Sequence, residues 1–395
     1  MSFPIILNFS DSYSSDWDMV CEMVKKVEER FKSGKQGEVK AELNENMSDE
    51  LNIAMNDSWQ DKECIYLDWN VFKYMSSPRS DKESLDVDIL SLVKRLKNKY
   101  IIPYSEGHIK DRSSRYKEEY RSEIEKDFAF TKTITEDYLL ISSSRIYDEK
   151  RKKCFPEIII TKKSMMEYFD AYVDMVKVES TVDIKPDGIK FEEFTVDMNG
   201  IGEDHPLYEF LKNNDGKVST SGIDEFVNDL YQIIFDDTEL YKRLRSYIEK
   251  LDAEKILNQQ MDFNARLQTD RLLYYMAPMI ECLHDDENAL STKWKGICEC
   301  WFSMNGGKPS FEQMMKQGYV LLDFHPLFND KLKKGKNTLD NIVRDGSHCY
   351  YASRAKYFVS EDEKTRKKTA LMYKTFGIKT KVVSEGEFVQ IFALT

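Results

Sequence analysis

The sequence predicts an α/β fold built on a parallel β-sheet and interrupted by a large, mainly helical insertion. Short apolar strand patterns alternate with amphipathic helix patterns over residues 61–112 and again over 320–395. This alternation is typical of a parallel sheet covered by helices. Between these two segments, residues 113–319 have helical spacing of apolar residues over most of their length. We therefore expect an N-terminal extension at 1–60, followed by an α/β domain in two parts that flank the insertion.

The first part of the α/β domain has a strand, helix, strand pattern. Residues 63–72, ECIYLDWNVF, are almost continuously apolar, which predicts a strand buried on both faces. Residues 84–98 have apolar side chains at helical spacing and predict an amphipathic helix. The run YIIPYS at 100–105 predicts a second short strand. Two strands joined by a helix run parallel, so their carboxyl ends lie at the same edge of the sheet.

The remaining parts are predicted from the same patterns. The N-terminal extension contains a possible strand at 3–9 and an amphipathic helix pattern at 14–34. The insertion has helix patterns with aromatic residues at three- and four-residue steps, for example at 223–237, and we interpret these aromatic residues as core. An alternating segment with Pro and Gly at 177–206 predicts a small strand pair or a loop. In the second part of the α/β domain, the sequence pattern predicts, in order, a helix at 336–355, a strand at 356–362, a helix at 364–377 and an edge strand at 377–383.

Acidic residues stand where the predicted strands end. Asp68 ends the run IYLD, Glu106 follows the strand at 100–105, and Asp362 follows the run YFVS. Carboxylates that leave the carboxyl ends of neighbouring strands lie together, and they are the oxygen ligands that Mg²⁺ and Mn²⁺ prefer. Several carboxylates at one sheet edge repel one another unless protons or cations intervene, so such a group is costly and is usually functional.

Three short motifs give the chain a resemblance to a known family. A strand ends in Leu-Asp-x-Asn at 67–70, a helix contains Asp-x-x-His-x-x-x-Ala at 345–352, and a later strand ends in a hydroxyl residue and an acid. In this order and context the motifs resemble those of the PIN-domain nucleases, over residues 61–112 and 320–395. The resemblance implies a PIN-like, Rossmannoid parallel sheet and a metal-dependent enzyme of a kind that mostly cuts RNA.

The same resemblance implies the site residues. Asp68, Asp345 and Asp362 match the family's catalytic, metal-binding acids. Glu106 completes the set as a fourth catalytic and metal-binding acid, with Asp111 as its rival because the family's second acid usually lies on a helix. Side chains expected to orient these acids or to contact phosphate are Asn70, Ser360 and His348, and for His348 a packing role in the core is an equal alternative.

The implied activity is hydrolysis of RNA phosphodiester bonds with Mg²⁺ or Mn²⁺ as cofactor, and DNA is the alternative substrate. A bacterial toxin or phage-defence effector would fit this architecture. A catalytically inactive, PIN-like scaffold that binds nucleic acid or protein is a second reading, because Trp69 stands where the family often has a small hydroxyl residue. LDWN is also similar to the start of haloacid-dehalogenase phosphatases, but those enzymes need a second acid where this chain has Asn70.

Composition sets limits on partners and compartment. The formal net charge of −12 counts against a protein that coats nucleic acid in bulk, although basic clusters at 94–99, 150–153, 331–336 and 364–368 could form a local phosphate track. Seven scattered cysteines do not have the spacing of a disulfide framework. Apolar runs are far shorter than the roughly 20 residues that a membrane helix needs. We expect a cytoplasmic protein with an RNA substrate, no membrane association, and a protein partner or homo-oligomer as a further option.

Overall fold

The computed structural model describes residues 59–114, 116–143, 147–148, 153–154, 157–181, 192–195, 203, 208–220, 237–250, 277–303, 309–332 and 338–393. The strand and helix predicted at 3–9 and 14–34, the helix pattern at 223–236 and most of the basic clusters at 150–153 and 331–336 lie outside these residues. Within them, no helix combines the length and the apolar character needed to cross a membrane.

The described residues form two compact units. The α/β unit contains residues 59–181, 310–316 and 344–393, and the second unit contains residues 192–309 and 317–343, each with the gaps given above. The α/β unit thus includes residues 116–181, which lie within the predicted insertion. All of the candidate site residues belong to the α/β unit.

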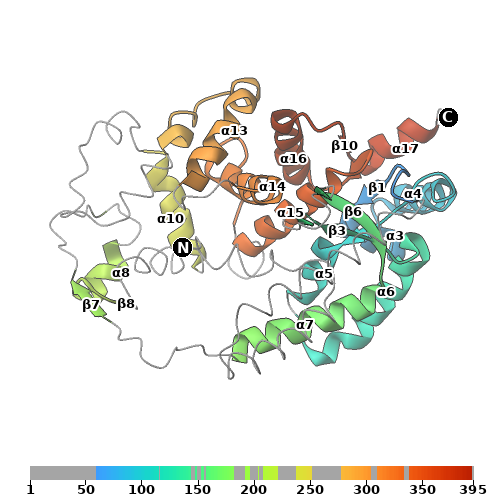
Figure 1. Cartoon of the computed structure of the whole chain (residues 1–395), viewed down its shortest axis with the longest axis horizontal. Helices are drawn as coiled ribbons and strands as arrows, with labels where there is room; N and C mark the ends of the chain where they lie inside the picture. The colour runs from blue at the N-terminus through green and yellow to red at the C-terminus, as the bar shows by residue number, and fades with distance from the viewer. Residues whose placement is uncertain are drawn as a thin grey trace. The chain divides into compact units, whose positions relative to one another are not determined.

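A parallel sheet joins the two ends of the described chain. Strand β1 (Ile65–Leu67) pairs with β9 (Tyr357–Val359), which in turn pairs with β10 (Lys381–Val383), all in parallel. In Figure 1 the blue strand β1 accordingly lies in the same region as the red C-terminal segments. The prediction of an α/β fold with a parallel sheet is confirmed, and β10 is the edge strand, as expected.

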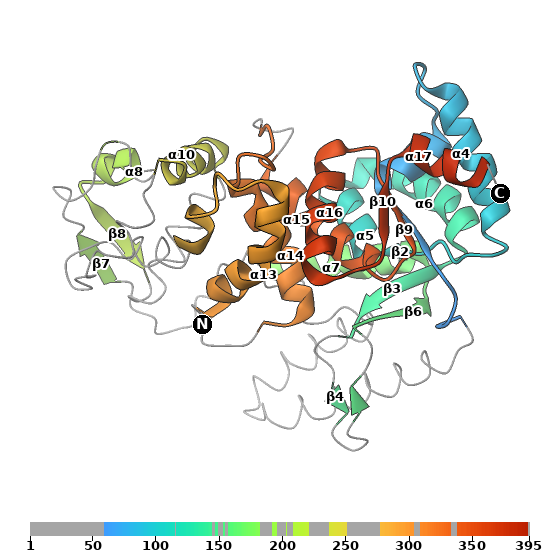
Figure 2. The same ribbon diagram turned by 90° about the horizontal axis from the view of Figure 1, so that it is seen from above.

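A second sheet contains β2 (Tyr104–Ser105), which lies within the strand predicted at 100–105, and two strands that the sequence patterns did not predict. Strand β2 pairs in parallel with β3 (Tyr138–Ser142), and β3 pairs in antiparallel with β6 (Ile158–Lys162), as Figure 2 shows. An isolated parallel bridge between Cys64 and Ile101 connects this chain segment to β1. Helical stretches were predicted to dominate this region, and β3 and β6 were not predicted, because periodicity cannot tell a short apolar strand from a turn of buried helix.

The strand expected at 63–72 is shorter than predicted. It ends at Leu67, and helix α3 (Trp69–Ser76) begins directly after Asp68, whose extended backbone precedes the first turn. The apolar run continues beyond the strand because α3 also buries Val71, Phe72 and Met75. Asn70 therefore lies on a helix.

Helices cover both sheets of the α/β unit. Helix α3 packs with α4 (Glu83–Leu96) and α17 (Glu385–Ala393) on β1, β9 and β10, in a core that contains Phe72, Val93 and Phe388. The second sheet packs against α5 (Glu106–Ser113), α6 (Arg121–Thr135) and α7 (Met165–Thr181). Other elements are η2 (Glu118–Tyr120), the antiparallel pair β4 (Tyr147–Asp148) and β5 (Lys153–Cys154), α15 (Leu339–Ala352) and α16 (Glu363–Phe376).

The second unit is mainly helical among its described residues. Its elements are β7 (Glu192–Thr195), α8 (Tyr208–Asn213), β8 (Lys217–Thr220), α10 (Thr238–Ile248), α13 (Glu287–Ser303), η4 (Leu322–Phe324) and the later part of α14 (Phe311–Leu321). In the segment 177–206, where a strand pair or a loop was expected, the described residues include β7, whose antiparallel partner β8 lies after this segment. A buried ion pair joins Arg245 to Asp323 at 2.8 Å.

Candidate metal centre

Asp68 lies at the carboxyl end of β1, where sequence and structure agree on its place. Its side chain is only 6% exposed. The parallel pairing of β1 with β9 brings Ser360 beside it, and the Ser360 hydroxyl donates a hydrogen bond of 2.7 Å to Asp68 Oδ2. Burial raises the pKa of Asp68 above its ordinary value, and the negative charge of Asp111 acts in the same direction. The ionised form of Asp68 is therefore costly in this position.

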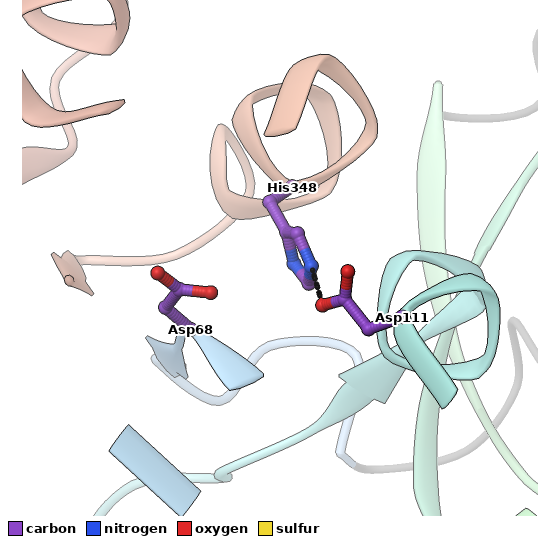
Figure 3. Close-up of side chains that lie close together, drawn as sticks. All are labelled: Asp68, Asp111 and His348. Carbon is purple, nitrogen blue, oxygen red and sulfur yellow. Dashed lines mark hydrogen bonds and ion pairs between the residues drawn. The ribbon is translucent and has the colours of Figure 1, made fainter. Parts of the chain in front are cut away.

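Two further side chains complete a group with Asp68. Asp111 comes from α5 and His348 from α15, and Figure 3 shows the three side chains converging from separate elements. His348 Nε2 lies 2.8 Å from Asp111 Oδ2. Potential ligand atoms of Asp68, Asp111 and His348 all lie within 4.8 Å of one another. This largely buried group could hold a metal ion.

Asp111 and His348 form an ion pair. Burial acts to raise the pKa of Asp111, but the positive charges of His348 and Arg344 outweigh it and hold that pKa below its ordinary value. Burial acts to lower the pKa of His348, and the hydrogen bond and charge of Asp111 outweigh it, so the pKa of His348 is raised. Arg344 Nε also donates to Asp111 Oδ1 at 3.1 Å. Asp111 is thus held from two sides in its ionised state.

The other nitrogen of His348 is held by a tyrosine. The Tyr66 hydroxyl lies 2.7 Å from His348 Nδ1 and 2.6 Å from Ser105 Oγ. Tyr66 is the middle residue of β1 and has no exposed surface. A continuous chain of hydrogen bonds therefore runs from Asp111 through His348 and Tyr66 to Ser105, and it fixes the orientation of the imidazole ring.

His108 is held as a neutral ring beside this chain. The Ser105 backbone N–H donates to His108 Nδ1 at 3.0 Å, so Nε2 carries the proton and donates to the Leu67 carbonyl at 2.8 Å. Burial, together with the positive charge of His348, lowers the pKa of His108 to about 3. This neutral histidine ties the first turn of α5 to the end of β1.

Asp345 and Asp362 lie close to the same group and share one neighbour. The Thr365 hydroxyl donates to Asp345 Oδ2 at 3.3 Å, and the Thr365 backbone N–H donates to Asp362 Oδ1 at 2.8 Å. Burial raises the pKa of Asp345 well above its ordinary value, and the negative charges of Asp68, Asp111 and Asp362 raise it further. Asp362 itself is exposed and caps the N-terminus of α16.

Glu106 is placed in a different group. Its carboxylate lies 3.0 Å from Lys110 Nζ and accepts a hydrogen bond of 3.1 Å from the Tyr351 hydroxyl. Of the two candidates for the second acid, Asp111 is the one that meets Asp68 and His348 within 4.8 Å. Asn70, the second residue of α3, is partly buried.

Trp69 has a packing role that accounts for a large side chain after Asp68. Its ring lies edge-on to Phe128, with centroids 6.3 Å apart, and the Arg112 guanidinium lies 5.6 Å from the indole centroid. It is part of the core of the second sheet. The Trp69 side chain therefore packs between α3 and α6.

Three residues of the site were missed by reasoning from the sequence, namely Tyr66, Ser105 and Arg344. Tyr66 alternates with Ile65 and Leu67 along β1, so its side chain points to the other face of the sheet. The alternation can be seen in the sequence, but His348, the hydrogen-bond partner of Tyr66, is 282 positions away in the chain.

Comparison of the chain with protein-family models, with curated proteins and with solved structures found no match.

Proposed function

We propose that the protein is a metal-dependent nuclease that hydrolyses phosphodiester bonds of RNA. The observation that carries the proposal is the convergence of Asp68 and Asp111 with His348 within 4.8 Å, from three separate elements. Buried carboxylates at such separations are unfavourable unless positive charge balances them. The PIN-like order of motifs in the sequence supports the same class of enzyme.

The donor set fits a hard divalent cation. Asp68 and Asp111 would supply carboxylate oxygens, and Asp345 would supply a third, since its pKa responds to the charges of both. The two nitrogens of His348 are engaged by Asp111 and Tyr66, so the imidazole would orient Asp111 rather than bind the ion. Oxygen ligands of this kind favour Mg²⁺ or Mn²⁺ over softer metals.

The protein groups would prepare the site for hydrolysis. When bound, Mg²⁺ or Mn²⁺ supplies the positive charge that lowers the pKa of a water molecule and stabilises charge on the phosphate. Ser360 holds one oxygen of Asp68, and His348 and Arg344 hold the two oxygens of Asp111, so both carboxylates are oriented in advance. No side chain is required as a nucleophile in this scheme.

A second candidate function is a binding scaffold without activity. It is favoured by the contacts of Glu106 and Asp362, whose carboxylates are engaged by Lys110 and by the first turn of α16. An inactive scaffold would need no cation at Asp68 and Asp111. The two candidates therefore differ in metal binding as well as in cleavage.

The test is cleavage of single-stranded RNA, structured RNA and DNA with Mn²⁺ or Mg²⁺ and with excess chelator. The wild type is compared with Asp68→Asn, Asp111→Asn and Asp345→Asn, and with Asp88→Asn on the exposed face of α4 as the matched control. We expect metal-dependent RNA cleavage by the wild type and the control, and loss in each site variant, because ligands of one ion act as a unit. Cleavage that persists in chelator, or in folded Asp68→Asn protein, would falsify this mechanism. If the wild type binds Mn²⁺ and cleaves only DNA, the proposed substrate is wrong and the proposed metal site still holds.

A further inference from the structure

A second cluster of buried charges lies in the α/β unit beside the candidate metal centre. It consists of Glu106 and Lys110 on α5 and Glu312 and Lys316 on the first part of α14, and we call it the Glu106–Lys316 cluster. Lys316 Nζ lies 2.7 Å from Glu312 Oε1 and 3.7 Å from Glu106 Oε2. Lys110 Nζ lies 3.0 Å from Glu106 Oε1. Two acids and two lysines thus balance one another within the fold.

All four members of the cluster are less than a tenth exposed. Removing such charges from water costs about as much as their mutual attraction returns, so a buried ion pair is rarely more stable than well-packed apolar side chains. Loss of one partner is strongly unfavourable, because an uncompensated charge is left inside the protein. Such a cluster therefore restricts the helices that carry it to one arrangement more than it adds stability.

The cluster is connected to the metal centre through α15. Tyr351 donates a hydrogen bond of 3.1 Å to Glu106 Oε2, and Tyr351 follows His348 by three residues. Residues three apart lie on the same face of a helix. On α5, Glu106 and Lys110 directly precede Gly107 and Asp111, the two residues that lie against His348. The cluster and the Asp111–His348 ion pair are thus two neighbouring contacts between the same two helices.

A second tyrosine extends the connection to the sheet. Lys316 Nζ lies 5.4 Å from the ring centroids of both Tyr350 and Tyr351. The Tyr350 hydroxyl lies 2.9 Å from Ser142 Oγ on β3. The first part of α14, the end of β3 and the end of α15 are therefore joined by polar contacts around one buried lysine. This arrangement leaves α15 little freedom to slide along α5.

We propose that Glu106, Lys110 and Lys316 are positioning residues, which hold α5 and α15 in the register at which Asp111 meets His348. This inference rests on the metal site proposed above. It assigns Glu106 a role that differs from the ligand role implied by the family resemblance. The carboxylate acts through α5 on Asp111, five residues further along the helix, and it would make no direct contact with the ion.

The test uses the full chain and the variant Glu106→Gln. The carboxamide can still accept the hydrogen bond from Tyr351, but it removes the charge that balances Lys110 and Lys316. Two site readouts are measured: Mn²⁺ affinity by titration calorimetry, and the ring-nitrogen NMR signals of His348 in the metal-free protein, assigned by their absence in His348→Gln. Asp323→Asn is the matched control, because it breaks a buried acid–arginine pair in the other unit.

We expect Glu106→Gln to weaken Mn²⁺ binding by roughly tenfold or more, the effect usual for residues that orient metal ligands. The His348 ring signals should move as well. Asp323→Asn should lower the melting temperature and leave both readouts unchanged. If Glu106→Gln fails to fold, the charge-balanced pair Glu106→Gln with Lys110→Met takes its place with the same two readouts.

The proposal is overturned if the folded variant melts lower but keeps the Mn²⁺ affinity and the His348 signals of the wild type, since the cluster would then only stabilise the fold. A wild type that binds no Mn²⁺ would refute the proposed function. The His348 signals in the metal-free protein would still decide the positioning role in that case. The two failures are therefore distinguishable.

Discussion

The imidazole ring of His348 lies directly against the backbone of Gly107. A Cβ atom at Gly107 would stand 2.9 Å from His348 Cε1 and 3.0 Å from Nδ1. Gly107 lies in the first turn of α5, one turn before Asp111. The absence of a side chain there lets α15 approach α5 closely enough for His348 to reach Asp111.

We expect Gly107→Ala to displace His348 and to weaken Mn²⁺ binding by roughly tenfold or more, as loss of an orienting partner does. The ring is held at both nitrogens, so it cannot move without breaking a hydrogen bond to Asp111 or Tyr66. The measurement is Mn²⁺ affinity together with thermal unfolding. Gly386→Ala in α17 is the control, because nothing lies within 4 Å of a Cβ there, and it should be neutral or stabilising by up to about 1 kcal/mol. Wild-type Mn²⁺ affinity in Gly107→Ala would show that His348 tolerates the shift.

Removing the charge of Asp68 should separate metal binding from folding. Mn²⁺ at about a hundredfold above its dissociation constant should stabilise the wild type by about 2.7 kcal/mol. In Asp68→Asn this stabilisation should vanish. The melting temperature without metal should stay the same or rise, because burial and Asp111 already disfavour the ionised carboxylate. Differential scanning calorimetry with Mn²⁺ and with chelator measures both effects, and an equal Mn²⁺ effect in wild type and Asp68→Asn would exclude Asp68 as a ligand.

The Tyr66 hydroxyl should matter more to the site than an equivalent buried hydroxyl elsewhere. Tyr66→Phe leaves His348 Nδ1 and Ser105 Oγ without that partner, which should cost about 1–3 kcal/mol of stability. Metal affinity should fall as well, because the ring would lose one of its two anchors. Tyr104→Phe removes a comparable hydrogen bond of 2.7 Å to the Lys163 carbonyl, and it should reduce stability without changing Mn²⁺ affinity. Equal Mn²⁺ affinities in the two variants would argue against a role for Tyr66 at the site.

The neutral state of His108 predicts a loss of stability in mild acid. Its pKa is about 3 in the folded protein and about 6.5 when unfolded, so between these values the unfolded chain binds a proton that the native state does not. Stability should therefore fall as the pH falls below about 6.5. The loss from pH 7.5 to 5 should be about 2 kcal/mol from this group.

The measurement is urea unfolding of the wild type and of His108→Gln across this pH range. The raised pKa of His348 acts in the opposite sense, and it contributes to both proteins. The difference between the two curves therefore isolates His108. Parallel pH profiles for the two proteins would mean that His108 has the same pKa in the folded and unfolded states, which contradicts the lowered pKa.

Local sequence pattern was enough to predict the strands of the parallel sheet, although the first of them ends at Leu67 and not at residue 72. Nearly continuous apolar residues around Asp68 and before Ser360 predicted β1 and β9, because parallel strands are buried on both faces. The pairing of these strands then follows from the α/β alternation. The helix that carries Asp345 and His348 was predicted as part of the same alternation, and the three-residue spacing of these two residues placed them on one face of it.

Tertiary structure alone decided which acid joins Asp68. Glu106 and Asp111 are five residues apart on one short helix, and at 100° per residue their side chains point about 140° apart. Only one of them can face β1, and the choice depends on how α5 is rotated against the sheet. That rotation is set by the contact of Gly107 with His348 and by the hydrogen bond from His108 to Leu67, which join segments far apart in the sequence. Sequence periodicity fixes the faces of each element, whereas the packing of elements against one another fixes which faces meet.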